Sequence, residues 1–288
     1  MERWGILDIG TNTLHGAIYQ TAGGAFKKEG AKILPSPIYA GIQNGILCQK
    51  GILALGQALR EMRTWFQAQK IQKIHAFATA SLRMADNAAA VCREMEALTG
   101  ILIAVLTENA EAECDFLAAR AATDEPDGAG FDLGGGSMQI VAFQGNRLTA
   151  AVSMDMGTRR YWDQFVAGKR PTESELSAID QAAAERLRQA PGTVYPRLYA
   201  MGGTAKCARK LWAALAQKPV DILQADNLRT LLQMPDFLEQ AAKERYQTLT
   251  AGLVIMLALC ARFQTAALQV LPWGVREGYL LKLMAGRE

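Results

Sequence analysis

The chain has 288 residues, which at a soft prior of about 150 residues per domain suggests two domains. Half of the residues are hydrophobic and a fifth are charged, so the sequence predicts a packed core and excludes wholesale disorder. A net charge of +3 offers no bulk-charge argument for nucleic acid or an anionic membrane, and two histidines with five scattered cysteines argue against a zinc or haem protein. No Cys-x-x-Cys pair occurs, so we expect reduced thiols in a cytoplasmic protein with no signal peptide.

The first half of the chain alternates between predicted strands and helices. Trp4, Ile6 and Leu7 indicate a first strand, and a return strand is expected over 14–19. The elements that follow are expected at helix 52–69, strand 74–78, helix 87–98, strand 102–106 and helix 110–122.

The second half begins after a turn-rich link at 124–130, so we place a domain boundary near residue 122. The predicted domains are therefore 1–122 and 123–288. Helices are expected at 172–189, 206–216, 226–232, 235–243 and 246–261. The last of these is the most apolar stretch of the chain, but a membrane span needs about 20 residues, so it is interpreted as a buried core helix. The alternation of strands and helices predicts an α/β fold.

An internal repeat links the two halves. Segments 6–20 and 130–144 align without a gap, and Asp8 meets Asp132 at an offset of 124 residues. Each copy has the pattern of a strand, a glycine-containing turn and a return strand, with an aspartate just before the turn. A third glycine-rich turn is expected at 202–204, between a strand over 198–201 and the helix at 206–216.

This repeat predicts two similar lobes facing a cleft that holds phosphate groups. Turn N–H groups are donors for anions, and the two aspartates are ligands that suit Mg²⁺. The sequence has no G-x-x-x-x-G-K-[ST] motif, which excludes a P-loop, and G-x-G-x-x-G does not follow a strand.

Six ordered blocks of the sequence resemble the exopolyphosphatase / guanosine pentaphosphate phosphohydrolase family. The blocks lie at 8–15, 78–83, 106–113, 132–137, 201–205 and 273–278. The resemblance implies two ribonuclease-H-like (actin-like ATPase) lobes, each a mixed sheet flanked by helices, with an interdomain cleft. It also allows the C-terminal helix at 274–288 to complete the first lobe. The chain resembles the short two-domain form of the family, which puts processive use of long polyphosphate in doubt.

The resemblance also assigns roles to residues. Glu111 takes the place of the catalytic general base, with Glu108 and Glu113 as competing carboxylates and a helix-start acid as the structural alternative. Asp8 and Asp132 take the place of the metal ligands. The residues implied to bind phosphate are Thr11, Asn12, Thr13, His15, Arg83, Gly134, Gly135, Gly136, Ser137, Gly203 and Thr204.

Two positions depart from the family pattern. His15 stands where many relatives have arginine, and Ala110 replaces the first of two adjacent acids. A structural role stays open for His15, and a surface position stays open for Arg83.

The expected function is an enzyme, a Mg²⁺- or Mn²⁺-dependent phosphohydrolase that releases terminal orthophosphate from polyphosphate, guanosine pentaphosphate or both. The alternatives are a non-catalytic polyphosphate or nucleotide sensor, and an ATP-dependent small-molecule kinase or ATPase of the same superfamily. The expected partner is the polyphosphate or phosphorylated guanosine nucleotide, without nucleic acid or membrane. Relatives are often dimers, so a homodimer is also expected.

Overall fold

The computed structural model describes residues 2–192, 195 and 197–286. The chain forms two compact units: unit 1 comprises Met1–Ala110 with Leu283–Glu288, and unit 2 comprises Glu111–Lys282. The helices α5 (Glu108–Ala121) and α12 (Val275–Ala285) each contribute residues to both units. The domain boundary near residue 122 stays a prediction.

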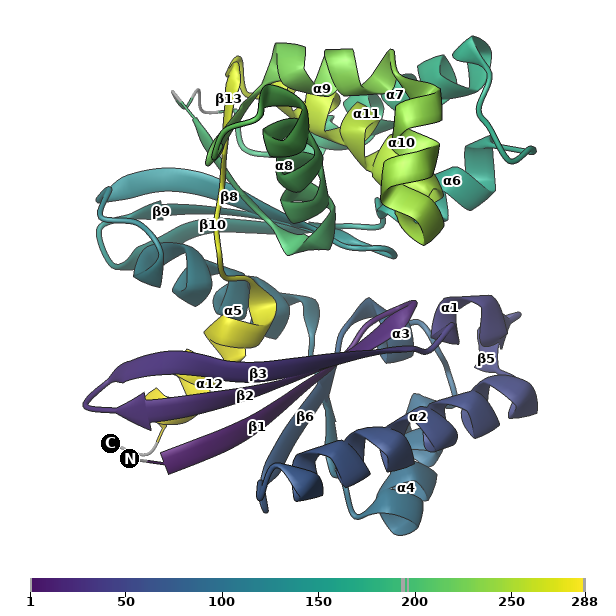
Figure 1. Cartoon of the computed structure of the whole chain (residues 1–288), viewed down its shortest axis with the longest axis vertical. Helices are drawn as coiled ribbons and strands as arrows, with labels where there is room; N and C mark the ends of the chain where they lie inside the picture. Colours follow the sequence, from purple (N-terminus) through teal and green to yellow (C-terminus); the bar gives the residue numbers. More distant parts are fainter. Residues whose placement is uncertain (1, 193–194, 196, 287–288) are drawn as a thin grey trace. The chain divides into compact units, whose positions relative to one another are not determined.

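Unit 1 is built on a mixed sheet with strand order β3-β2-β1-β6-β7 (Figure 1). The first three strands run antiparallel, whereas β6 and β7 run parallel to β1. A separate small hairpin joins β4 to β5. The strands are β1 Glu2–Ile9, β2 Thr13–Ala22, β3 Ala25–Pro35, β4 Ile42–Gln43, β5 Ile46–Leu47, β6 Ile74–Ala78 and β7 Ile103–Val105.

The long helix of unit 1 covers one face of this sheet. Apolar residues at helical spacing on α2, including Leu59 and Phe66, share a buried cluster with Leu7, Ile9 and Leu14 of the sheet. The helix begins earlier than the predicted 52–69 because its first residues are polar and add nothing to the apolar period. The helices are α1 Ile38–Gly41, α2 Gln49–Ala68, α3 Ala80–Arg83 and α4 Ala88–Thr99.

Unit 2 is built on a larger sheet with strand order β10-β9-β8-β11-β13-β12. As in unit 1, a central strand pairs with an antiparallel neighbour on one side (β8 with β9) and a parallel one on the other (β11). The strands are β8 Asp127–Leu133, β9 Met138–Gln144, β10 Arg147–Met154, β11 Leu198–Met201, β12 Ile222–Gln224 and β13 Ala267–Val270.

Helices cover both faces of the second sheet. On one face α11 is buried almost all round and packs among α6, α7 and α9, as Figure 1 shows, so the predicted core helix is confirmed. On the other face Ala112 and Phe116 of α5 cluster with Val141, Phe143 and Tyr199. No helix in the described part of the chain is long and apolar enough to cross a bilayer. The remaining helices are α6 Thr158–Phe165, α7 Glu173–Arg186, α8 Gly202–Ala216, α9 Ala225–Leu232, α10 Pro235–Ala242 and α11 Tyr246–Arg262, with 3₁₀ turns at Leu187–Gln189 and Lys243–Arg245.

The strand pairing confirms the predicted strand–turn–strand repeat. Asp8 pairs with His15 across β1 and β2, and Asp132 pairs with Gln139 across β8 and β9. Both partners keep the offset of 124 residues. The third predicted turn is different, because α8 already begins at Gly202 rather than at 206. Gly203 therefore lies in the first turn of the helix, whereas Gly202, with a φ of +86°, makes the bend by which the chain enters it.

Candidate active site

The turn after β8 is held in place by its carbonyl groups. The N–H of Gly134 donates to the carbonyl of Ser137 at 3.0 Å, and the carbonyls of Gly134 and Gly135 accept from the first two N–H groups of α6, both at 2.9 Å. Within the described residues, the N–H groups of Gly135 and Gly136 donate to no protein acceptor. Backbone N–H groups are normally paired, so a concave turn with two available donors is suited to an anion.

Close backbone approach makes this turn possible. A Cβ atom on Gly157, just before α6, would lie 2.3 Å from the carbonyl oxygen of Gly135. A Cβ atom on Gly252 of α11 would lie 2.3 Å from Cγ2 of Thr204 and 3.1 Å from Cγ2 of Thr158. Thr204 is therefore buried with its methyl group against α11. Its role as a phosphate ligand stays a prediction, as does that of the exposed Gly203.

Asp132 is a buried carboxylate surrounded by backbone. Its Oδ1 would lie 2.5 Å from a Cβ atom on Gly202, and its Oδ2 would lie 3.3 Å from one on Gly274. The N–H of Val275 donates to this carboxylate. Burial raises the pKa of Asp132, while the nearby charge of Lys206 and the hydrogen bonds lower it. The site thus holds a buried carboxylate at the carboxyl end of β8, next to the start of α8.

The helix α5 supplies two more buried acids to unit 2. Asp115 is buried, and its interaction with the Asp132 carboxyl group lowers the pKa of Asp132. Glu111 lies one turn earlier on the same helical face and is 6% exposed. The competing Glu108 and Glu113 are both exposed, and Glu113 is paired with Lys282. Burial distinguishes Glu111 from these two acids, and its role as general base stays a prediction.

A buried acid of α12, Glu277, positions the backbone next to Asp132. Glu277 is 3% exposed, accepts from the N–H of Gly274 at 3.1 Å and pairs with Arg276 at 3.2 Å. It thereby fixes the 274–275 backbone that contacts Asp132. The α12 backbone packs directly on α5, since a Cβ atom on Gly278 would lie 1.8 Å from the carbonyl oxygen of Cys114.

Sequence reasoning did not single out Asp115 or Glu277 as site residues. The only sequence signal for Asp115 is its position four residues after Glu111 on a predicted helix, and Glu277 lies inside the last of the six blocks.

The turn of unit 1 repeats this geometry. The N–H of Gly10 donates to the Thr13 carbonyl at 3.0 Å, and the carbonyls of Thr11 and Asn12 accept from N–H groups of the segment at 36–39, at 3.0 and 2.8 Å. Among the residues that the structure describes, the N–H groups of Thr11 and Asn12 have no protein acceptor. The half-buried Asp8 precedes this turn. Its position in β1 is equivalent to the position of Asp132 in β8. Both turns therefore have a preceding carboxylate and two available donors.

His15 takes part in holding its own turn. Its Nε2 lies 2.8 Å from Oγ1 of Thr13. At the equivalent place in unit 2, Nε2 of Gln139 donates to Oγ of Ser137 at 3.1 Å. The same interaction in both copies supports the structural alternative for His15, and a phosphate contact by its ring stays a prediction.

Arg83 closes the short helix α3 rather than opening a helix. Its Nη1 donates to the carbonyl of Leu106 at 3.0 Å, and Ser81 of the same helix donates to the carbonyl of Ile9 at 2.5 Å. These contacts tie the segment after β6 to the ends of β1 and β7. The predicted phosphate contact of Arg83 stays a prediction.

The described residues contain no group of three or more His, Cys, Asp and Glu side chains arranged to hold a metal. The predicted ligands Asp8 and Asp132 lie in different units. The bound metal and the ligand roles of Asp8 and Asp132 stay predictions.

These features define an α/β protein with two similarly built units, each with a central strand that carries an aspartate next to its end and a turn of the anion-binding type. The chain belongs to the Ppx/GppA phosphatase family, whose model matches residues 40–286. Exopolyphosphatase 1 of Mycobacterium bovis is 23% identical over 303 residues, which cover 97% of this chain and 88% of that protein. An uncharacterized protein of Streptomyces coelicolor is 34% identical over 123 residues, which cover 41% of this chain and 37% of that protein.

Solved structures show the same fold. The crystal structure of an exopolyphosphatase from Cytophaga hutchinsonii matches with a TM-score of 0.88 at 18% identity and covers 99% of this chain and 98% of its own. That of the Aquifex aeolicus Ppx/GppA family member matches with a TM-score of 0.82 at 22% identity, with the same coverage. The predicted family, the two-lobed α/β fold and the phosphatase class of enzyme are therefore confirmed. The cleft between the lobes stays a prediction.

Proposed function

We propose that the protein is a metal-dependent phosphohydrolase that releases terminal orthophosphate from polyphosphate, guanosine pentaphosphate or both. The observation that carries the proposal is the repeated turn, which in each unit follows an aspartate-bearing strand and leaves two N–H groups without a protein acceptor. A chain of phosphates offers many anionic oxygens to such donors. The exopolyphosphatase names of several relatives point to the same substrate class.

In this proposal Glu111 is the general base. A buried carboxylate can accept the proton of the attacking water, and fixed N–H donors stabilise the negative charge on the phosphoryl oxygens. The N–H groups of Gly135 and Gly136 supply these donors in unit 2, and Thr11 and Asn12 supply them in unit 1. The other predicted phosphate contacts, from Thr13 and Ser137 to Arg83, Gly203 and Thr204, belong to the same proposal.

The proposed cofactor is Mg²⁺ or Mn²⁺, held by Asp132 and by Asp8. When bound, such an ion neutralises phosphate charge and orients the phosphoryl group. The charge of Lys206 and the N–H of Val275 both favour the ionised form of Asp132, which is the form that binds a metal.

The test is orthophosphate release from polyphosphates of several lengths and from guanosine pentaphosphate, with Mg²⁺ and Mn²⁺. Glu111→Gln is expected to lower turnover by about 10²–10⁴-fold, the usual contribution of a general base, while substrate binding is retained. The matched control is Glu113→Gln, two positions along the same helix and exposed, which should keep full turnover.

Each other outcome has a clear meaning. Full turnover in Glu111→Gln would falsify its assignment as base. Tight substrate binding without turnover under any divalent metal would favour a non-catalytic sensor. That alternative is suggested by Ala110 and His15, which depart from the family pattern. ATP consumption that depends on an acceptor would favour a kinase. The homodimer and the cytoplasmic location stay predictions.

A further inference from the structure

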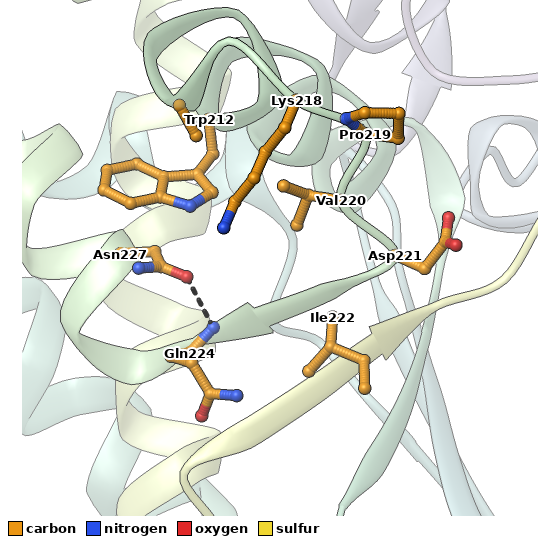
Figure 2. Close-up of a pocket in the computed structure, with 9 residues that line it drawn as sticks. Trp212, Lys218, Pro219, Val220, Asp221, Ile222, Gln224 and Asn227 are labelled. Carbon is orange, nitrogen blue, oxygen red and sulfur yellow. Dashed lines mark hydrogen bonds between the residues drawn. The ribbon is translucent and has the colours of Figure 1, made fainter.

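The end of α8 distant from Gly202 borders an open cavity of about 660 Å³ in unit 2 (Figure 2). Trp212 lines it from the helix, Ile222 and Gln224 line it from the edge strand β12, and Asn227 lines it from α9. Trp212 follows Gly203 by about nine residues in the same helix, which corresponds to a distance of roughly 14 Å along the helix axis. The cavity is therefore distinct from the place around Asp132, and what it binds is independent of the function proposed above.

The uncompensated charge at this cavity is positive. Lys218 is exposed, and its ammonium group has no ion pair or hydrogen bond among the residues that the structure describes. The acid that lines the cavity, Asp221, is already paired with Arg209 at 3.2 Å. The backbone N–H of Lys218 donates to the carbonyl of Ala213 at 3.3 Å, so its side chain leaves from a fixed point at the helix end. An anionic group is the complementary partner for this cation.

The other polar groups suit a flat ring with a polar edge. Figure 2 shows the ammonium of Lys218 pointing between the indole of Trp212 and the amide of Asn227. The Oδ1 of Asn227 accepts from the N–H of Gln224 at 2.8 Å, which orients this amide and leaves its Nδ2 as a donor. The side chain of Gln224 also lines the cavity and takes part in a capping box with Asn227 at the start of α9. An indole stacks with flat rings, whereas paired amides recognise ring edges that carry donors and acceptors.

We propose that this cavity binds a nucleoside monophosphate. The base stacks on Trp212, its polar edge meets the amides of Asn227 and Gln224, and the phosphate meets Lys218. The single uncompensated cation favours one phosphate group over a long polyanion, and the two amides favour a nucleobase over a plain aromatic ring. The cavity volume lies within the range of ordinary small-molecule sites, about 300–1,000 Å³.

Calorimetric titration of the full chain with adenosine, guanosine and uridine monophosphates tests the proposal, with ribose 5-phosphate and benzoate as partial ligands. The nucleotides should bind at least about tenfold more tightly than either partial ligand. Lys218→Gln and Trp212→Leu should each weaken nucleotide binding by roughly tenfold, the size of a lost charge-assisted hydrogen bond or a lost base stack. Trp212→Phe should retain most of the affinity. Lys210→Gln, an exposed residue of the same helix outside the cavity, should leave it unchanged.

The titrations are repeated with saturating tripolyphosphate, which competes for the turns around Asp8 and Asp132. Nucleotide binding that persists with tripolyphosphate and is lost in Lys218→Gln supports the proposal, whether or not the protein hydrolyses polyphosphate. Nucleotide binding that tripolyphosphate removes and Lys218→Gln leaves intact overturns it. No nucleotide binding at millimolar concentration, or equal affinity for benzoate, also overturns it. Far-UV circular dichroism confirms that each variant is folded.

Discussion

The backbone at Gly202 offers a sharp test of how Asp132 is held. Gly202 has φ of +86°, and a Cβ atom there would lie 2.5 Å from Oδ1 of Asp132. Gly202→Ala therefore combines two costs. A side chain in the left-handed region costs about 1–2 kcal/mol, and overpacking costs about 1–3 kcal/mol. The expected loss is roughly 3 kcal/mol, or a fall in Tm of about 6–12 °C for a unit of this size.

The adjacent glycine is the matched control. A Cβ atom on Gly203 would lie 2.5 Å from Nη2 of Arg245, but this is the end of a flexible side chain that can move. Gly203 lies in the helix α8, is exposed and does not have a positive φ. Gly203→Ala should therefore change the free energy of unfolding by less than about 1 kcal/mol.

Thermal unfolding followed by circular dichroism measures both variants, and orthophosphate release measures the effect on Asp132. Gly202→Ala should lose stability and turnover together, because the alanine displaces the carboxylate. Equal melting temperatures for the two variants, with turnover retained in Gly202→Ala, would refute the reasoning that the Gly202 backbone packs against Asp132.

Three further predictions concern groups in unit 2. Thr172→Ala should lower the free energy of unfolding in urea by about 1 kcal/mol, because Thr172 caps α7 through the N–H of Glu175; an unchanged midpoint would contradict the cap. The N–H groups of Ala167 and Thr172 lower the pKa of the Glu175 carboxyl group. The wild type should therefore have a larger free energy of unfolding than Glu175→Gln at pH 7. This difference should disappear as the pH falls below about 4, where the carboxyl group becomes protonated. Burial raises the pKa of Cys114 to about 12 and that of Cys260 to about 11. Both thiols should therefore react with a thiol reagent at pH 8 only after the protein unfolds. Rapid labelling of either thiol in the native protein, mapped by mass spectrometry, would contradict this prediction.

Local patterns were sufficient to predict much of the fold. The gap-free alignment of Asp8 with Asp132 predicted two equivalent strand–turn–strand units, and the pairing register agrees residue by residue. A turn and its two strands are formed by contiguous residues, so their sequence carries the information. The uniformly apolar 246–261 segment likewise indicated a core helix without any knowledge of its neighbours.

Other elements gave weak local signals. The strand β3 is rich in lysine, forms an edge of its sheet and is largely exposed, so it lacks a clear apolar alternation. The helix α8 begins four residues before the predicted position, since two glycines suggest a turn unless the packing around them is known. Short elements such as α3 and β12 depend on tertiary contacts more than on their own sequences.

By itself, then, the sequence determined the two repeated turns, the aspartate before each and the family to which the chain belongs. Only the tertiary structure decided which acids are buried together, because Asp115, Asp132 and Glu277 come from segments far apart along the chain. Spacing within a sequence does not encode such contacts. Burial of a carboxylate arises when β8, α5 and the 274–277 segment pack against one another, and this packing distinguishes Glu111 from the exposed acids beside it.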